Sequence, residues 1–175
     1  DGVCLDFSSG FHHFMLSEFG LITSSQEPIN FNYSDCYPTV NSLMPMIKDF
    51  VNSRDYFSQI KAYPCALEAF KKYKSDIGGN IRIITSCGTS TETKEARELC
   101  IEREFPGLIS DIIFCDFGAC KSDVVNSLPG SIFMDDLADV CSKVRSKSDH
   151  SVFLINRKYN EKTNQNNQTD PSINR

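Results

Sequence analysis

The feature that most constrains the fold is an alternation of strand-like and helix-like segments that begins at residue 81. "IRIITS" (81–86) is a β-branched apolar run, and "TETKEARELCIEREF" (91–105) has apolar side chains at helical spacing. The alternation continues with expected strands and helices in turn at 109–116, 121–128, 131–136, 137–146 and 151–156. This succession predicts an α/β fold with a mostly parallel sheet and helices on both of its faces.

The earlier residues have a different pattern, in which the spacing predicts helices at 11–20, 42–53 and 65–76. The first two are separated by "SSQEPINFNYSDCYPT" (24–39), whose Ser, Asn and Pro content is typical of a surface loop or lid. The last stretch is polar and rich in Asn. The domain organisation expected is an α/β core at 1–10 and 63–156, an inserted helical cap at 11–62, and a polar tail or loop at 157–175.

Composition narrows the classes of partner. The net charge of the 175 residues is −5 and no basic stripe is present, which argues against a nucleic-acid partner or a membrane surface. There is no apolar run of about 18 residues and no signal-peptide pattern. A chain of this length can bury roughly 70% of its unfolded surface in one core. We therefore expect a cytoplasmic protein with a small-molecule ligand, with a homodimer left open.

The eight cysteines are scattered along the chain and form no C-x-x-C pair. An even number of cysteines is compatible with a disulfide framework, but most of these lie within apolar stretches. We expect them to be reduced residues of the core in a cytosolic protein.

Polar side chains stand at the carboxyl ends of the expected strands, where parallel sheets form ligand crevices: Thr85, Ser86, Asp116, Asp135 and Asp136. The adjacent carboxylates of Asp135 and Asp136 repel each other unless a cation lies beside them. The pair therefore indicates a metal ion or a cationic ligand. The alternative is that Asp135 caps the next helix, with Asp136 in its first turn.

Four segments in this order resemble the motifs of the haloacid-dehalogenase-like (HAD-like) phosphatases, and most closely those of the 5′(3′)-deoxyribonucleotidases. They are "DGVCLDFSSGF" (1–11), "ITS" (84–86), Lys121 and "FMDD" (133–136). The resemblance covers nearly the whole chain. It implies a Rossmann-like, HAD-like three-layer sandwich with a mostly parallel sheet and a small helical cap.

The resemblance departs from the family at the nucleophile. The family's nucleophilic Asp stands two positions before the Asp that matches Asp1, so the resemblance places it, with its central strand, upstream of the recorded chain. An alternative alignment makes Asp6 the nucleophile at the end of "GVCLDF", with Ser8 in the position of the second Asp.

The activity implied by the resemblance is hydrolysis of a phosphomonoester through an aspartyl-phosphate, with Mg²⁺ as cofactor. Asp1 would act as general acid and base through its side chain and would bind the metal through its backbone carbonyl. Asp135 and Asp136 would complete the metal ligands from the protein.

The phosphate group would be held by Thr85 and Ser86, and Lys121 would neutralise the charge of the transferring phosphoryl group. With Asp1, the residues Thr85 and Lys121 form the expected catalytic set.

The substrate implied is a (deoxy)ribonucleoside monophosphate, so the protein would be a 5′-nucleotidase. Phe7, Tyr56 and Phe57 are the expected substrate-binding residues, because aromatic rings flank the nucleobase in the deoxyribonucleotidases. Phe31 and Tyr33 in the lid loop are weaker candidates. The alternative function is a catalytically inactive HAD-like domain that binds a phosphate ligand or a partner.

Overall fold

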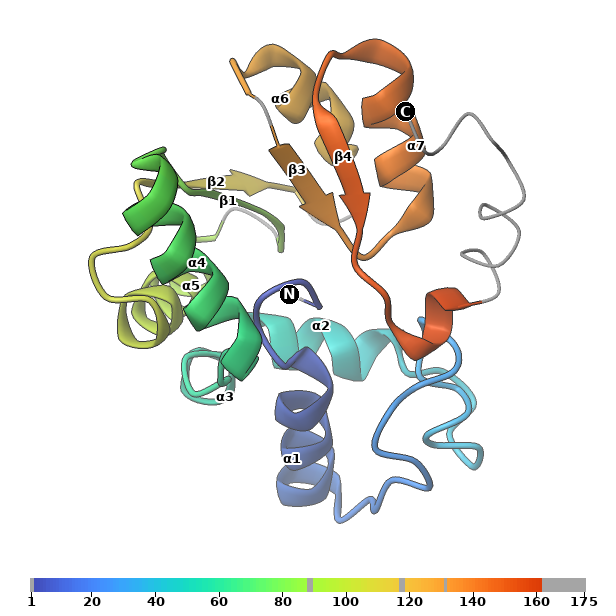
Figure 1. Ribbon diagram of the computed structural model, residues 1–175. Helices are drawn as coiled ribbons and strands as arrows, with labels where there is room; N and C mark the ends of the chain where they lie inside the picture. Colours follow the sequence, from blue (N-terminus) through green and yellow to red (C-terminus); the bar gives the residue numbers. More distant parts are fainter. Residues whose placement is uncertain (1, 88–89, 117–118, 131, 162–175) are drawn as a thin grey trace.

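The alternation predicted from residue 81 onward is present in the computed structural model, which describes residues 2–87, 90–116, 119–130 and 132–161 (Figure 1). The helices of this part are α1 (Phe7–Phe19), α2 (Met44–Asn52), α3 (Arg54–Phe57), α4 (Pro64–Ile77), α5 (Thr91–Glu104), α6 (Lys121–Ser127), α7 (Ala138–Lys147) and the 3₁₀ helix η1 (Lys158–Asn160). The strands are β1 (Arg82–Ser86), β2 (Asp111–Cys115), β3 (Ile132–Asp135) and β4 (Ser151–Leu154). The fold is therefore mixed α/β, as predicted.

The strands pair in parallel, but as two separate sheets. β1 pairs with β2 from Arg82 opposite Asp111 onward, and β3 pairs with β4 from Ile132 opposite Ser151 onward. The expectation of one continuous sheet is thus not met by the described residues, although the parallel direction is confirmed. The second edge of β1 and the second edge of β3 have no strand partner in this part of the chain.

Local sequence signals explain where several helices begin and end. The Asp6 carboxylate accepts the backbone N–H of Ser9 at 3.1 Å and caps α1, so this helix begins before the predicted residue 11. Pro64 stands in the first turn of α4, and Gly78 ends that helix at φ 71°, which favours glycine. The Ser90 hydroxyl likewise caps α5.

The alternative alignment required Asp6 to end a first strand, and the structure overturns that expectation. Among residues 2–6, the only β pairing is an isolated antiparallel bridge from Leu5 to Ala62. Both Asp6 carboxylate oxygens bind Ser9, one its backbone N–H and the other its hydroxyl at 2.7 Å. Asp6 therefore serves as a helix cap.

The core lies mainly among helices. The rings of Phe11, Phe14, Phe50 and Phe57 are buried together in α1, α2 and α3. The same buried cluster continues into α5 at Ala96, Cys100 and Ile101, and into Phe105 directly after that helix. The region 11–62, expected as an inserted cap, thus shares one core with α5.

The β3–β4 sheet is covered on one face only in the described part of the molecule. Helix α7 packs against this sheet, and its Cys141 and Val144 are buried. Because side chains alternate along a strand, Ile132 and Met134 share the opposite face with Phe153, which pairs with Met134. These three side chains are about half exposed. The expected coverage by helices on both faces is therefore not seen here.

All eight cysteines are free thiols, as predicted. Six of them are buried, whereas Cys65 and Cys120 are exposed.

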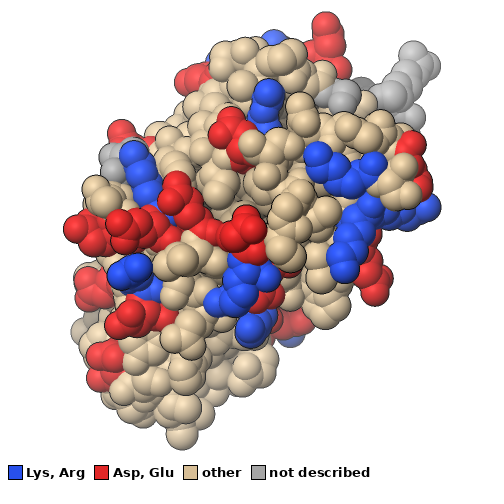
Figure 2. Space-filling model, turned by 90° about the vertical axis from the view of Figure 1, so that its left-hand side faces the viewer, with Lys and Arg blue, Asp and Glu red and all other residues tan. Residues whose placement is uncertain are grey.

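The described helices include none that is long and apolar enough to cross a membrane. Figure 2 shows that acidic and basic side chains are interspersed over the face that carries α4 and α5. Ion pairs such as Lys72 with Asp76 at 2.7 Å lie on this exposed surface.

Candidate functional site

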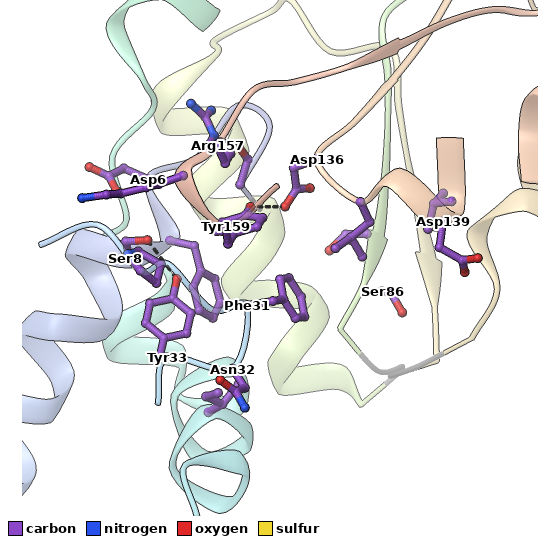
Figure 3. Close-up of a pocket in the computed structure, with 18 of the residues that line it drawn as sticks. Asp6, Ser8, Phe31, Asn32, Tyr33, Ser86, Asp136, Asp139, Arg157 and Tyr159 are labelled. Carbon is purple, nitrogen blue, oxygen red and sulfur yellow. Dashed lines mark hydrogen bonds between the residues drawn. The ribbon is translucent and has the colours of Figure 1, made fainter. Parts of the chain in front are cut away.

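A cavity of about 780 Å³ lies where several parts of the chain meet. Its walls come from α2, from the first turns of α1, α6 and α7, from the loop residues 26–33, from the ends of β1 and β3, and from a segment after β4 (Figure 3). We call this last segment, residues 156–161, the C-terminal strap. The carboxyl ends of parallel strands thus border the cavity, as expected for a ligand site in an α/β fold.

Thr85 and Ser86 form the end of β1 at this cavity. The Ser86 hydroxyl donates to the backbone carbonyl of Asp116 at 2.8 Å, which links the ends of β1 and β2. Thr85 is only 3% exposed, and its buried Oγ1 has no hydrogen-bond partner among the described residues. A buried hydroxyl without a partner costs free energy, so Thr85 Oγ1 is suited to bind a ligand oxygen.

Lys121 lines the cavity from the first residue of α6, and its ammonium donates to Asp135 Oδ2 at 2.6 Å. The other Asp135 oxygen accepts the backbone N–H of Leu137 at 2.9 Å. The sequence led us to expect a cation beside the two aspartates. For Asp135, the Lys121 ammonium is that cation. The expected metal-ligand role of Asp135 is not supported, because both of its oxygens are engaged and it does not line the cavity. The helix-cap alternative is also wrong, since Leu137 is the N-cap of α7.

Asp136 does line the cavity, and it is only 5% exposed. Its Oδ2 accepts the Tyr159 hydroxyl. Burial and the neighbouring Asp136 carboxylate raise the pKa of Tyr159, so its hydroxyl keeps its proton and remains a donor. A Cβ added at Gly2 would lie 2.6 Å from the same Oδ2, and Gly2 has φ +72°. Only glycine lets the chain approach this carboxylate so closely.

The C-terminal strap is bound tightly to the rest of the molecule. The Arg157 guanidinium donates to the backbone carbonyls of Gly2 at 2.6 Å and Val3 at 3.2 Å. The buried Asn160 side chain donates to the carbonyl of Asp136 at 2.8 Å. Of the expected polar tail or loop at 157–175, residues 157–161 are thus held against the rest of the molecule rather than being a free tail, while 162–175 lie outside the described residues.

Aromatic rings form another wall of the cavity, but only one of the three expected ones belongs to it. Phe7 lines the cavity, as predicted, and so do the weaker candidates Phe31 and Tyr33. The Phe31 ring meets the Tyr159 ring edge to face at 5.6 Å between centroids. The Tyr33 hydroxyl is hydrogen-bonded to Ser8 at 2.9 Å (Figure 3).

Tyr56 and Phe57 lie elsewhere, and the expectation that they bind substrate is corrected. Phe57 is fully buried in the aromatic core beside Phe50. The Tyr56 hydroxyl points outward and donates to Glu18 at 2.5 Å. Neither residue of α3 lines the cavity, which residue type alone does not reveal.

The residues at the cavity fit a hard cation in part. Asp136 supplies a buried carboxylate oxygen, and the glycine turn at Gly2 leaves open the space beside this oxygen that a Cβ would fill. The described residues contain no group of three acidic, His or Cys side chains that could hold a metal. Asp1, the remaining expected ligand and the expected general acid, lies outside the described residues.

Sequence reasoning missed Arg157, Tyr159 and Asn160. Their segment is polar and has no apolar periodicity, so the only local signal is one aromatic residue between polar neighbours. Their contacts reach Gly2, Val3 and Asp136, far away in the sequence. Such long-range contacts carry no periodic signature in the sequence.

Comparison with known proteins gives one distant similarity. No family model matches the chain. A protein of Enterobacteria phage T4, described as "Uncharacterized 32.4 kDa protein in Gp30-rIII intergenic region", is 24% identical over 149 residues. The match covers 81% of this chain and 53% of the phage protein, so the chain spans about half the length of this relative.

Proposed function

We propose that this chain belongs to a Mg²⁺-dependent phosphomonoesterase of the HAD type, a 5′-nucleotidase that acts on (deoxy)ribonucleoside monophosphates. The proposal includes the Rossmann-like arrangement implied by the motif resemblance. The observation that carries it is that one cavity is lined by Thr85 at the end of β1, Lys121 at the start of α6 and Asp136 directly after β3. These are the residues of three of the four motifs.

The phosphate group would lie against the end of β1. Thr85 Oγ1 is buried, lines the cavity and has no partner among the described residues, so a phosphate oxygen would satisfy it. Lys121 brings a positive charge to the same cavity and is held in place by Asp135. A fixed ammonium stabilises the negative charge that develops on a transferring phosphoryl group.

Asp136 would be the principal metal ligand on the protein side, because its carboxylate is buried and faces the cavity. Bound Mg²⁺ would screen the repulsion between an attacking carboxylate and the phosphate. In the reaction, the nucleophilic carboxylate would form a bond to phosphorus while the bond from phosphorus to the leaving oxygen breaks. Asp1 would give its proton to that leaving oxygen and would later take a proton from the water that hydrolyses the aspartyl-phosphate.

The proposal requires a nucleophile from residues preceding this chain, and the arrangement of the sheets supports a position for it. The second edges of β1 and β3 are unpaired in the described residues, and residues at the ends of both strands border one cavity. A strand between them would satisfy both backbone edges and would bring its carboxyl end to the cavity.

A nucleoside is the leaving group that the cavity favours. Its volume of about 780 Å³ exceeds what a phosphate group alone needs, and Phe7, Phe31 and Tyr33 provide ring surfaces. Phe31 is 59% exposed, so its ring is accessible for stacking on a base. Stacking of one base on one ring contributes about 1–3 kcal/mol.

A second candidate function is a domain that binds a phosphate ligand without catalysis. It is favoured by one observation, which is that three carboxylates at or beside the cavity are already engaged by other groups of the protein. Asp6 caps α1, Asp135 pairs with Lys121, and Asp136 accepts Tyr159.

The test is hydrolysis of nucleoside monophosphates by the full-length protein, measured as released phosphate. We expect activity that requires Mg²⁺, and Asp136→Asn should lower it by at least about a hundredfold because a charged metal ligand is lost. Asp76→Asn, on the exposed surface of α4, is the matched control and should leave activity unchanged. Activity that persists in excess chelator would contradict the proposal, and phosphate binding in calorimetry without turnover would favour the second function.

A further inference from the structure

The lid loop, residues 24–39, contains no helix or strand, so its shape depends on side-chain contacts. The Asp35 carboxylate accepts the backbone N–H groups of Ile29 at 2.8 Å and Asn30 at 2.9 Å. The Ser24 hydroxyl donates to the backbone carbonyl of Asp35 at 2.8 Å, which joins the start of the loop to its end. The loop is therefore closed on itself, and a few contacts with the rest of the molecule can place it as one unit.

Two residues of α1 hold the lid loop by hydrogen bonds. Ser8 is bonded to the Tyr33 hydroxyl in the middle of the loop at 2.9 Å. His12 is bonded near both ends of the loop, because its Nε2 lies 3.1 Å from the carbonyl oxygen of Gln26 and its Nδ1 lies 2.7 Å from the Tyr37 hydroxyl. His12 is 8% exposed and does not line the cavity. Its link to the cavity therefore runs through the loop.

The two partners of His12 define which of its nitrogens carries the proton. The Gln26 carbonyl can only accept, so Nε2 donates to it, and Nδ1 of the neutral ring accepts the Tyr37 hydroxyl. Burial raises the pKa of Tyr37 to about 12, so this hydroxyl keeps its proton. Burial also lowers the pKa of His12, although the Gln26 carbonyl and the Asp6 carboxylate act in the opposite direction. The neutral ring thus makes both bonds at the same time.

The lid loop and the expected phosphate site belong to different parts of the cavity wall. Phe31 and Tyr33 line the cavity from the loop (Figure 3), and so does Gln26, whose carbonyl His12 binds. Thr85 and Lys121, which would bind the phosphate group, come from β1 and α6. The position of the loop therefore concerns the part of a ligand that extends beyond its phosphate group.

We propose that His12 is a positioning residue, which holds the lid loop at the cavity and thereby determines how tightly the nucleoside part of a ligand binds. This inference rests on the proposed function, because it takes the ligand to be a nucleoside monophosphate. One buried ring fixes Gln26 and Tyr37, so loss of either bond releases one end of the loop from α1.

The test uses two variants that remove one bond each. Tyr37→Phe keeps the ring and removes the hydroxyl that donates to Nδ1 of His12. His12→Asn keeps a polar group near the position of Nδ1 and loses the donor to Gln26. His13→Gln, at an exposed position of the same helix, is the matched control.

The first measurement follows the loop without a ligand. Chymotrypsin, whose specificity pocket is hydrophobic, can cleave after Phe31 in the loop and after Phe19 at the end of α1, and both rings are exposed. Cleavage after Phe31 should be about fivefold faster in Tyr37→Phe and in His12→Asn than in the wild type, the effect of losing one hydrogen bond. Cleavage after Phe19 should keep its rate, and mass spectrometry of the fragments measures both sites.

The second measurement is calorimetric titration of the full-length protein with adenosine or uridine 5′-monophosphate and, separately, with inorganic phosphate. Both variants should bind the nucleotide about fivefold more weakly than the wild type. Their affinity for inorganic phosphate should be unchanged, because phosphate would contact Thr85 and Lys121 but not the loop. His13→Gln should match the wild type for both ligands.

The outcomes separate the inference from the proposed function. Unchanged nucleotide affinity in both variants, in a protein that hydrolyses nucleotides, would overturn the role of His12 and leave the proposed function intact. Parallel losses of nucleotide and phosphate affinity, or equally faster cleavage after Phe31 and Phe19, would also overturn it, because they indicate a general loss of stability. The expected pattern in a protein that binds nucleotides without hydrolysing them would support the role of His12 and count against the proposed function. A wild type that binds phosphate but neither nucleotide would overturn both.

Discussion

The helical region formed by α1, α2 and α3 buries most of its aromatic rings, whereas the β3–β4 sheet leaves several apolar side chains exposed. Phe50 is fully buried and contacts the rings of Phe7, Phe11, Phe14 and Phe57. In the β3–β4 sheet, Phe153 is 52% exposed and its neighbours Ile132 and Met134 are similarly open. The comparison teaches that buried apolar side chains are concentrated in the helical region and α5. The candidate site instead lies at the ends of two short sheets whose edges are unpaired in the described residues.

The difference has a physical basis in the size of the sheets. Two paired strands of four or five residues are not stable alone in water, so each sheet depends on the helices packed against it. The helical region instead contributes its buried side chains to one continuous apolar core. Open strand ends and unpaired edges leave polar groups available to a ligand.

The largest expected effect comes from removing one ring in each region. Phe50→Ala should lower the free energy of unfolding by about 3–5 kcal/mol, because it leaves a cavity in a closed aromatic core. Phe153→Ala is the matched change in the sheet and should cost less than about 1.5 kcal/mol, because half of the ring is already exposed. Urea unfolding measures both. Equal losses would show that the two regions do not differ in this way.

The next effect concerns the ion pair between Lys121 of α6 and Asp135 at the end of β3. Lys121→Met should destabilise the fold by about 3 kcal/mol, because it leaves the buried Asp135 carboxylate without its cation. Lys143→Met breaks the exposed pair with Asp139 and should cost less than about 0.5 kcal/mol. Thermal unfolding of the two variants compares these losses, and a similar small loss in both would mean that the Lys121 pair is screened by solvent.

The smallest expected effect is a pH dependence of stability that comes from His12 in α1. Burial lowers the pKa of His12 from its usual 6.5, and its ring is bonded to Tyr37 at 2.7 Å and to the carbonyl of Gln26 at 3.1 Å. The folded state then binds fewer protons than the unfolded state, so His12 lowers stability as pH falls through 6.5 toward the folded value.

The measurement is the unfolding midpoint in urea between about pH 7.5 and about pH 5.5, the range in which histidine titrates. In His12→Gln, the unfolding midpoint should fall less between about pH 7.5 and about pH 5.5 than it does in the wild type. His13→Gln, on the exposed side of the same helix, should keep the decline of the wild type. An unchanged slope in His12→Gln would assign the pH dependence to other groups.

Much of the fold could be predicted because its signals are local. Strand segments such as 81–86 and helices such as 91–105 were found from periodicity, since a strand and a helix each impose their own spacing on apolar side chains. The parallel direction of the strands followed from the alternation. Continuity of the sheet did not follow, because pairing depends on which edges meet in space.

The same division holds for the candidate site. The sequence by itself determined that Thr85, Lys121 and Asp136 stand at the ends of regular elements, and parallel strands bring such ends to one edge. Only the tertiary structure decided that Lys121 neutralises Asp135, that Phe57 belongs to the core, and that Tyr159 reaches Asp136. Side-chain partners that are distant in the chain are selected by packing, and packing leaves no periodic trace in the sequence.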